Sequence, residues 1–508
     1  MSKTFFHNER GLNSQVNLDM SSESKLGQNG TPFYLTTTLP YVNAPLHMGH
    51  ALEFVRADTI ARYKKLNGFD VYFNTGTDEH GMKIYEKAKE QGMEVQDFVD
   101  KGFVTFKEQL KIFGVLEDIH FIRTTDESHI KAAQEFWKRV EKNGYIYKKT
   151  YEAKYCVGCE SEKTDSELVD GHCPDHPNMD LKIINEENYF FKYSSFGDKL
   201  LKFYEDHPNF VVPSFRLNEI KNFVNGGLQD FSISRLKEKM PWGIPVPGGD
   251  DQVMYVWFDA LVNYISTLGW PNDDKENFEK YWINGNPTQY CGKDNTRFQA
   301  AMWQAMLMAA DVPNSHQIIV NGFITAEGGV RMSKSLGNGV DPKDIVEEYG
   351  TDALRYFLLR EVGSFEDSPF TVGRFKDAYN SGLANGLGNI ASRILTLSEK
   401  YLDKCPEIPE TSDFTEYFEI YENFDLKKAA DYVWDKIGEL DKTIQMTEPF
   451  KVVKVDVEKG KEMITDLVLK LYVIARMLNP LMPETNIKLK ELIKQNKKPE
   501  NPLFIRRE

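Results

Sequence analysis

The sequence predicts an α/β protein of several domains, built on a Rossmann-like parallel sheet. Three observations support this fold class. A strand, helix and strand pattern occupies residues 33–81, the pattern breaks near residue 145 into a turn-rich insertion with clustered cysteines, and long helical runs fill the chain from about residue 376. We therefore expect a doubly wound sheet domain that carries an insertion and is followed by an all-α bundle.

The composition fits a globular protein with more than one core. The chain has 508 residues, of which 41% are hydrophobic and 13% aromatic. No stretch approaches the roughly 20 apolar residues that span a bilayer, and residues 1–30 lack an apolar signal core. We expect a cytoplasmic protein without membrane association, and a disordered N-terminal extension over residues 1–30.

The net charge limits the expected binding partners, and the placement of the cysteines indicates the cellular compartment. The formal net charge of −15 argues against bulk attraction to nucleic acid, so a nucleic-acid partner would be bound by local patches. The five cysteines are unevenly placed, unlike a secreted disulfide framework, and this favours a reducing compartment.

The first predicted strand is "FYLTTTLP" (33–40), which is rich in β-branched and aromatic residues and stops at a proline. The segment "HMGHALEFVRADTIARYKKLNG" (47–68) carries apolar residues at helical spacing, and Gly68 offers a C-cap. The next strand is "FDVYFNTGTDEHG" (69–81). Ligands of such βαβ units bind beyond the carboxyl ends of the strands, which places His47 and His50 at the ligand end.

These two histidines, three positions apart, open the predicted helix. Taken alone, His47 and His50 fit half of a metal site, a phosphate clamp or a satisfied helix start. The metal role lacks a third ligand at a suitable spacing. Spacing alone does not choose between the other two.

The insertion carries a metal-binding pattern. Its spacing is Cys156-x2-Cys159-x13-Cys173-x2-His176, in which each short pair can chelate one tetrahedral ion. Three thiolates and one imidazole suit Zn²⁺, and complete ligation predicts a structural knuckle without an open catalytic position. The alternatives are reduced cysteines in a loop, or His172 in place of His176.

Sheet and helix patterns return after the insertion, at "QVMYVWFDALVNYIS" (252–266), "TQYCGKDNTRFQAAMWQAMLMAA" (288–310) and "QIIVNGFIT" (317–325). We expect the following division of the chain: an extension at 1–30, the first half of the sheet domain at 31–144, the insertion at 145–250, the second half at 251–325, a linker at 326–375 and the helical bundle at 376–508.

A second loop with small and basic residues lies in the linker, at "GGVRMSKSLGN" (328–338). It is not a Walker loop, but small residues with a lysine suit polyphosphate binding. A His-x-Gly-His helix start followed by a Met-Ser-Lys-Ser loop resembles the HIGH and KMSKS signatures of class I aminoacyl-tRNA synthetases, which read HMGH and RMSKS here. With "TGTDEHG", the cysteine knuckle, "YVWFDALVNY", "GKDN" and "VNGFI" in the same order, residues 32–490 resemble methionyl-tRNA synthetases.

The resemblance implies that ATP activates L-methionine to methionyl-adenylate, which then esterifies the 3′ end of tRNA. Catalysis would come from positioning and from charge stabilisation on the phosphates. The implied catalytic residues are His47, His50 and Lys334. The implied ATP site, with Mg²⁺ accompanying the nucleotide, comprises the catalytic residues and Gly49, Glu53, Gly292, Lys293, Asp294, Arg331 and Ser333.

The resemblance also implies a methionine pocket. Asp78 would meet the substrate ammonium, and an apolar wall would take the thioether. The implied wall residues are Leu39, Tyr41, Trp257, Ala260 and Tyr264, with the last three on one side if that segment is helical. Gln299 stands where relatives commonly have histidine. Without the resemblance, an aromatic stripe of this kind is more often plain core.

For tRNA, the resemblance implies recognition of a CAU anticodon by Asn389 and Arg393 on one helix face and by Phe450, which stands where a tryptophan is usual. We expect a monomer whose partners are ATP, L-methionine and tRNA(Met). Two alternatives are a class I synthetase for another amino acid, such as cysteine, and a tRNA- or nucleotide-binding protein without catalysis. The second predicts loss of His50, Lys334 or Asp78, yet all three are present.

Overall fold

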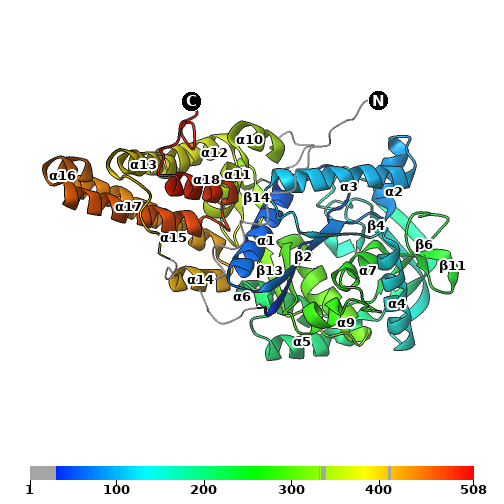
Figure 1. The fold of residues 1–508 in the computed structure, drawn as a ribbon. Helices are drawn as coiled ribbons and strands as arrows, with labels where there is room; N and C mark the ends of the chain where they lie inside the picture. Colours follow the sequence, from blue (N-terminus) through cyan, green and yellow to red (C-terminus); the bar gives the residue numbers. More distant parts are fainter. Residues whose placement is uncertain (1–29, 164, 331, 333–338, 410–413) are drawn as a thin grey trace, which may run out of the picture. The chain divides into compact units, whose positions relative to one another are not determined.

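The computed structural model describes residues 30–508 except 164, 331, 333–338 and 410–413. The chain forms two compact units. The sheet unit comprises Pro32–Ala57 and Tyr72–Phe323, and the helical unit comprises Asp58–Val71 and Ile324–Glu508 together with residues 30–31. Figure 1 shows the elements of both units in sequence colours.

A six-stranded sheet organises the sheet unit. Its order is β3-β2-β1-β12-β13-β7. The strands are β1 (Pro32–Thr36), β2 (Asp70–Thr77), β3 (His120–Arg123), β7 (Val211–Val212), β12 (Thr288–Gly292) and β13 (Gln317–Asn321). β1 pairs in parallel with β12, and β2 with β3, so the predicted parallel α/β fold is confirmed. The strand order reverses at β1, and ligands of doubly wound sheets bind at the carboxyl ends of strands at such a point.

Several helices accompany this sheet. They are α1 (Met48–Leu66), α2 (Met82–Glu90), α3 (Val95–Ile112), α4 (Glu127–Lys142), α5 (Gly197–Asp206), α6 (Ser214–Asn225), α7 (Val256–Ala260), α8 (Asn263–Ser266) and α9 (Trp303–Ala309). In α4 the buried residues recur at helical spacing, and Phe136 and Trp137 pack on Phe258. Burial of each such side chain stabilises the fold by about 2 kcal/mol.

The region between α4 and α7 adds antiparallel strands. One sheet has the order β5-β4-β6-β8 and another has the order β10-β11-β9. Their strands are β4 (Ile146–Cys156), β5 (Ser161–Lys163), β6 (Lys182–Phe191), β8 (Phe231–Ser232), β9 (Ser234–Leu236), β10 (Pro245–Val246) and β11 (Gly249–Met254). The cysteine-bearing turns follow β4, so a short antiparallel sheet anchors them.

The helical unit confirms the expected α-helical C-terminal region. Its helices are α10 (Pro342–Tyr349), α11 (Thr351–Tyr356), α12 (Val372–Ala378), α13 (Asn389–Tyr401), α14 (Thr415–Glu422), α15 (Leu426–Thr447), α16 (Pro449–Val455), α17 (Val457–Met477) and α18 (Pro483–Lys494), with two short strands, β14 (Ile324–Thr325) and β15 (Ser368–Pro369). In Figure 1, α13, α15 and α17 lie side by side, and α16 is at the end of this bundle.

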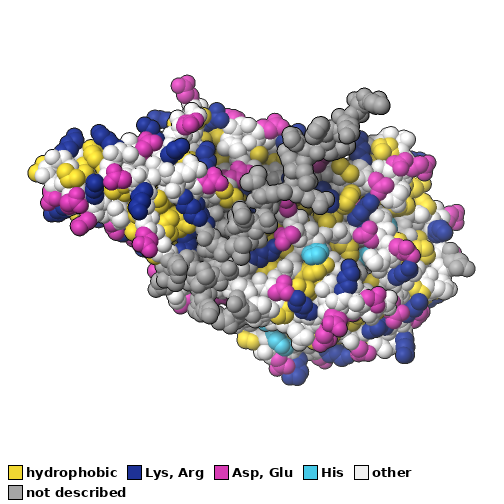
Figure 2. Space-filling model, in the orientation of Figure 1, with side chains coloured by type: hydrophobic (Ala, Val, Ile, Leu, Met, Phe, Trp, Pro, Cys, Tyr) yellow, Lys and Arg dark blue, Asp and Glu magenta, His cyan; other side chains and the backbone are white. Residues whose placement is uncertain are grey.

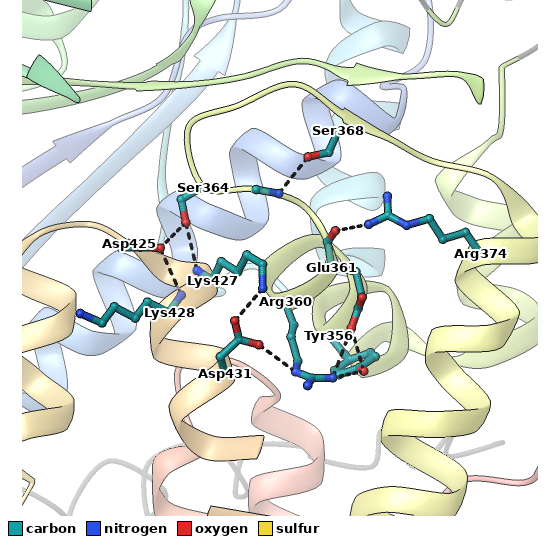
Figure 3. A network of polar contacts seen from close by, with 11 residues as sticks. Tyr356, Arg360, Glu361, Ser364, Ser368, Arg374, Asp425, Lys427, Lys428 and Asp431 are labelled. Carbon is teal, nitrogen blue, oxygen red and sulfur yellow. Dashed lines mark hydrogen bonds and ion pairs between the residues drawn. The ribbon is translucent and has the colours of Figure 1, made fainter. Parts of the chain in front are cut away.

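A polar network ties the start of α15 to the segment between α11 and α12 (Figure 3). Asp425 caps α15 by accepting the Lys428 N–H at 3.1 Å, and it also accepts the Ser364 hydroxyl at 2.7 Å. Six residues later, Asp431 pairs with Arg360 at 3.2 Å and with Lys427 at 2.6 Å. The first two turns of the longest helix are therefore held by the chain that precedes α12.

The surface carries charges of both signs. Figure 2 shows acidic and basic side chains interspersed over the face in view, without a continuous basic area among the coloured residues. Across the described part of the chain, no helix combines the length and apolarity needed to cross a bilayer.

Candidate active site

The two histidines meet at the N-terminus of α1. Their rings stack with centroids 3.8 Å apart. His47 Nδ1 accepts the Gly49 N–H at 3.1 Å, and His50 Nδ1 accepts the His47 N–H at 3.2 Å. A Cβ on Gly49 would lie 3.0 Å from the His47 ring, so a glycine suits this turn. Burial and the charge of His47 lower the pKa of His50 well below its ordinary value. The His47 ring therefore caps the helix start through the Gly49 N–H, which is one of the roles that the sequence left open.

Glu53 lies one turn further along α1. Its carboxyl accepts the backbone N–H and the hydroxyl of Thr38, which follows β1, at 2.7 and 2.6 Å. Burial raises the pKa of Glu53 to about 7, and the charge of Asp294 adds to the increase. The bonds from Thr38 and a backbone bond from Gly292 act in the opposite direction and lower the pKa. The carboxyl edges of β1 and β12 thus bring these predicted residues together. Lys293 lies over the Phe323 ring, 4.3 Å from its centre.

A carboxylate with an unpaired oxygen lies beside the same edge, after β2. The Asp78 N–H donates to the Pro40 carbonyl at 3.1 Å, so the Asp78 loop lies against the Leu39–Tyr41 segment that follows β1. Asp78 Oδ1 and the Tyr41 hydroxyl are buried and have no hydrogen-bond partner in the described structure. Burial raises the pKa of Asp78 well above its ordinary value, and the charges of Asp259 and Glu160 raise it further. A cation placed here would relieve both the burial cost and the repulsion.

Aromatic residues expected in the pocket wall contact one another and Gln299. Trp257, on α7, stacks on Phe298 with ring centres 3.9 Å apart, and its Nε1 has no partner in the described structure. The three residues do not share one helix, because α7 ends at Ala260 and Tyr264 belongs to α8. Gln299 fills its position with hydrogen bonds: its Oε1 accepts from Gln289 at 2.7 Å, and its Nε2 donates to the Tyr264 hydroxyl at 2.5 Å.

The cysteine cluster assembles as a possible metal site. One ligand atom from each of Cys156, Cys159, Cys173 and His176 lies within 4.8 Å of the others. Cys159 Sγ is 3.3 Å from His176 Nδ1 and 3.5 Å from Cys173 Sγ. A Cβ on Gly158 would lie 2.4 Å from the His176 ring, so the turn needs glycine to admit the imidazole. Here His176, and not His172, joins the three sulfurs.

Some predicted residues lie elsewhere. Arg331, Ser333 and Lys334 lie outside the described residues. In the helical unit, Arg393 and Phe450 line a shallow pocket of about 300 Å³, together with Ser392, Thr396, Leu397 and Ile444. Arg393 pairs there with Asp441 at 2.5 Å. Asn389 is exposed one turn before Arg393 on α13, and this confirms the shared helix.

Three residues that contact the expected site residues or their neighbours escaped the sequence reasoning. Thr38 holds Glu53, while His80 and Asp259 form a buried pair at 3.0 Å. For His80 and Asp259, the sequence offered only their closeness to expected site residues: His80 follows Asp78 by two residues, and Asp259 lies between Trp257 and Ala260.

Comparison with known proteins places this site in a family. Residues 33–395 match the family model described as tRNA synthetases class I (M). The chain is 40% identical over 474 residues to the methionine–tRNA ligase of Caldanaerobacter subterraneus subsp. tengcongensis, covering 90% of this chain and 73% of that one. It is 38% identical over 485 residues to that of Thermotoga maritima, covering 92% and 76%. The Mycobacterium tuberculosis methionyl-tRNA synthetase in complex with methionyl-adenylate matches with a TM-score of 0.84 and 36% identity, over 90% of this chain and 93% of that one.

The parallel sheet, the histidine-bearing helix start and these matches define a class I aminoacyl-tRNA synthetase. Within that class the chain belongs to the methionine–tRNA ligase family, and it is an aminoacyl-tRNA ligase.

Proposed function

We propose that this chain activates L-methionine with ATP to methionyl-adenylate and transfers the methionyl group to the 3′ end of tRNA(Met). The observation that carries the proposal is the buried, unpaired Asp78 Oδ1 next to the unpaired Tyr41 hydroxyl, at the carboxyl edge of the sheet. The complex of the Mycobacterium tuberculosis relative with methionyl-adenylate supports the same substrates.

The methionine roles follow from charge and shape. Asp78 receives the ammonium, so its charge is compensated only when substrate is bound. Trp257 with Leu39, Ala260 and Tyr264 forms the apolar wall, and the Gln299 amide fixes the Tyr264 hydroxyl. This arrangement leaves the substrate carboxylate to face the nucleotide.

The ATP roles follow from the helix start and the two strand ends. The N-terminus of α1, with His47, Gly49 and His50, offers N–H groups and a positive dipole end to the phosphates. Glu53 with Gly292, Lys293 and Asp294 holds the adenosine. Arg331, Ser333 and Lys334 supply the cationic loop, and Mg²⁺ accompanies the triphosphate. The methionine carboxylate oxygen forms a bond to the α-phosphorus while the bond to pyrophosphate breaks.

The metal of the cysteine cluster is proposed as one structural Zn²⁺. Three sulfurs and one imidazole nitrogen within 4.8 Å of one another match a closed tetrahedral set. When bound, the ion cross-links the turns that follow β4, and it supplies no open position for substrate.

The helical unit is proposed to read the CAU anticodon. Arg393 and Phe450 share a pocket, and Asn389 is on the same face of α13 as Arg393. A guanidinium, an aromatic ring and an amide suit unstacked bases. We propose a cytoplasmic monomer with the division given by the sequence: 31–144 and 251–325 for catalysis, 145–250 for the insertion, 326–375 for the linker and 376–508 for anticodon binding.

Pyrophosphate exchange with each amino acid tests the activation step. We expect methionine to give the fastest exchange, and faster exchange with cysteine or leucine would overturn the assignment. Charging of transcripts with a CAU anticodon, compared with transcripts carrying a changed anticodon, tests the transfer step and its tRNA. Absence of any exchange would favour a binding protein without catalysis.

A further inference from the structure

A buried chain of polar side chains connects three elements of the sheet unit. Asp259 Oδ2, on α7, is 3.0 Å from His80 Nδ1, in the loop after β2. Asp259 Oδ1 is 3.6 Å from His129 Nε2, on α4. His129 Nδ1 is 2.9 Å from the Ser266 hydroxyl. Asp259 and His129 are fully buried and His80 is 5% exposed, so water does not screen the charge of Asp259 effectively.

This cluster joins the two halves of the proposed methionine pocket. His80 is in the loop that presents Asp78, and its backbone N–H bonds the Asp78 carboxyl. Asp259 is on α7 between Trp257 and Ala260. The loop is fixed further by Trp242 Nε1, which donates to the Glu79 carbonyl at 2.6 Å. The His80–Asp259 contact therefore sets the distance between the carboxylate and the aromatic wall.

The cluster also governs the charges that face Asp78. Three other carboxyls surround it: Asp259, Glu160 and Glu79. Glu79 is paired with Arg123 at 2.8 Å. Glu160 accepts the Lys83 N–H at 2.7 Å and the Tyr155 hydroxyl, and it faces the cations of Lys83 and Arg235. Among the described residues, the basic side chains in contact with Asp259 are His80 and His129.

The charge of Asp259 persists in spite of its position. Burial would raise its pKa, but His80 and His129 hold the pKa of Asp259 below its ordinary value. Asp259 is therefore a fixed negative charge that raises the pKa of Asp78. Removal of either histidine would leave the buried Asp259 carboxylate without that partner, and a buried charge is costly when its partner is removed.

We propose that His80, Asp259 and His129 form a positioning cluster for methionine. The cluster fixes the Asp78 loop to α7, the helix of the pocket wall. It also compensates the charge of Asp259, which would otherwise repel the charge of Asp78. This inference rests on the proposed role of Asp78. His80 and His129 act through Asp259 and Asp78, so they are positioning residues and do not touch substrate.

The test is the methionine KM of His80→Gln in ATP–pyrophosphate exchange. Glutamine keeps a hydrogen-bonding amide but carries no charge. We expect the methionine KM to rise roughly tenfold while the ATP KM stays within about twofold. Since the effect works through the ionisation of Asp78, the ratio of variant to wild-type KM should fall as the pH rises from about 6 to about 8. A ratio independent of pH would overturn the charge role.

A second substitution separates charge from packing. In His80→Gln with Asp259→Asn, the repelling carboxylate is gone, so the methionine KM should return to within about threefold of wild type. If both substitutions acted only by disturbing the structure, their effects on the methionine KM would add. A double variant with a higher methionine KM than His80→Gln would therefore overturn the proposal. His207→Gln is the matched control, because His207 is an exposed histidine at the end of α5.

Two further measurements keep the outcome decisive. If His80→Gln does not fold by circular dichroism, His129→Gln replaces it, and a methionine KM that equals wild type would overturn the proposal. Asp78→Asn tests the role on which the inference rests. If Asp78→Asn leaves the methionine KM unchanged, the proposed site itself fails; if it raises the KM and His80→Gln does not, only the positioning cluster fails.

Discussion

At the scale of single residues, Glu53 shows how burial at the edge of a sheet changes the pKa of a side chain. Glu53 is 7% exposed, and three hydrogen bonds from Thr38 and Gly292 do not offset the cost of burying its charge. The group therefore titrates near neutral pH, where a small change in its surroundings changes its protonation.

Glu53→Gln is predicted to remove a pH dependence of stability. The pKa of Glu53 is about 7 in the folded chain, compared with 4.5 for the ordinary group, so the folded state binds the additional proton between these values. The free energy of unfolding of the wild type should consequently fall relative to the variant as the pH rises from 4.5 to 7, by up to about 3 kcal/mol. Urea unfolding at several pH values measures this, with the exposed Glu141→Gln as control. If the difference in free energy of unfolding between wild type and Glu53→Gln does not vary with pH, the pKa of Glu53 is that of an ordinary carboxyl.

Lys334→Ala is predicted to slow adenylate formation and to spare methionine binding. The lysine is proposed to stabilise charge that develops on the triphosphate, so its loss should lower the rate of activation by about a hundredfold or more. Stopped-flow measurement of adenylate formation gives the rate, and equilibrium dialysis gives the methionine affinity. Lys343→Ala, on the surface of α10, is the control. Unchanged activation would refute the role of Lys334.

At the scale of elements, turns and caps decide whether the chemistry-bearing segments are held in place. The cysteine knuckle has four short-range ligands but little core of its own: Tyr155 and Val157 form a small buried cluster with Met82 packed against it. The long helix α15, in contrast, buries eight residues along one face. We therefore expect the knuckle to depend on its metal and α15 to depend on its packing and cap.

Cys173→Ser is predicted to abolish metal binding. Wild-type chain purified without chelator should contain one zinc ion, and the variant close to none, because three ligands of the set remain. Plasma mass spectrometry measures the content, and hydrogen exchange over residues 156–176 reports the loss of local order. Cys405→Ser, outside the cluster, should keep the metal. Full metal content in Cys173→Ser would contradict the ligand set.

Asp425→Ala is predicted to cost more stability than the loss of an isolated helix cap. The carboxyl caps α15 and also accepts the Ser364 hydroxyl at 2.7 Å, whereas Asp456 caps α17 through the Lys459 N–H at 3.1 Å. We expect about 2 kcal/mol for Asp425→Ala and about 1 kcal/mol for Asp456→Ala. Urea unfolding followed by circular dichroism compares them. Equal losses would show that the contact with Ser364 adds nothing.

At the scale of the whole molecule, activation and tRNA selection are assigned to different units of the chain. Asp78, Trp257 and Glu53 belong to the sheet unit, whereas Arg393 and Phe450 belong to the helical unit. With a net charge of −15, the chain relies on local groups for its tRNA contacts.

Arg393→Ala is predicted to separate the two activities. The kcat/KM for charging a CAU transcript should fall about tenfold to a hundredfold, because a guanidinium that contacts bases is lost. Methionine-dependent pyrophosphate exchange should equal that of wild type. Lys436→Ala, a surface cation that pairs with Glu439, is the control. An equal loss of exchange in Arg393→Ala would argue against separate sites.

The sequence by itself determined the class of fold and the residues with chemical roles. Periodicity predicts the βαβ unit and the helical end, since local spacing sets which face of a strand or helix is buried. The spacing of Cys156, Cys159, Cys173 and His176 predicts a chelating set for the same local reason. Resemblance to a family supplied Asp78, Trp257 and Arg393, which spacing alone does not single out.

Only the tertiary structure decided which of these groups lack partners and which are held in buried pairs. His80 and Asp259 are 179 positions apart, so no local pattern predicts their contact at 3.0 Å. The unpaired Asp78 Oδ1, the stacking of Trp257 on Phe298 and the bonds of Gln299 likewise arise where separate segments meet. Hydrogen bonding and burial at the sheet edge depend on long-range packing, and that packing turns a set of named residues into a site for an ammonium group.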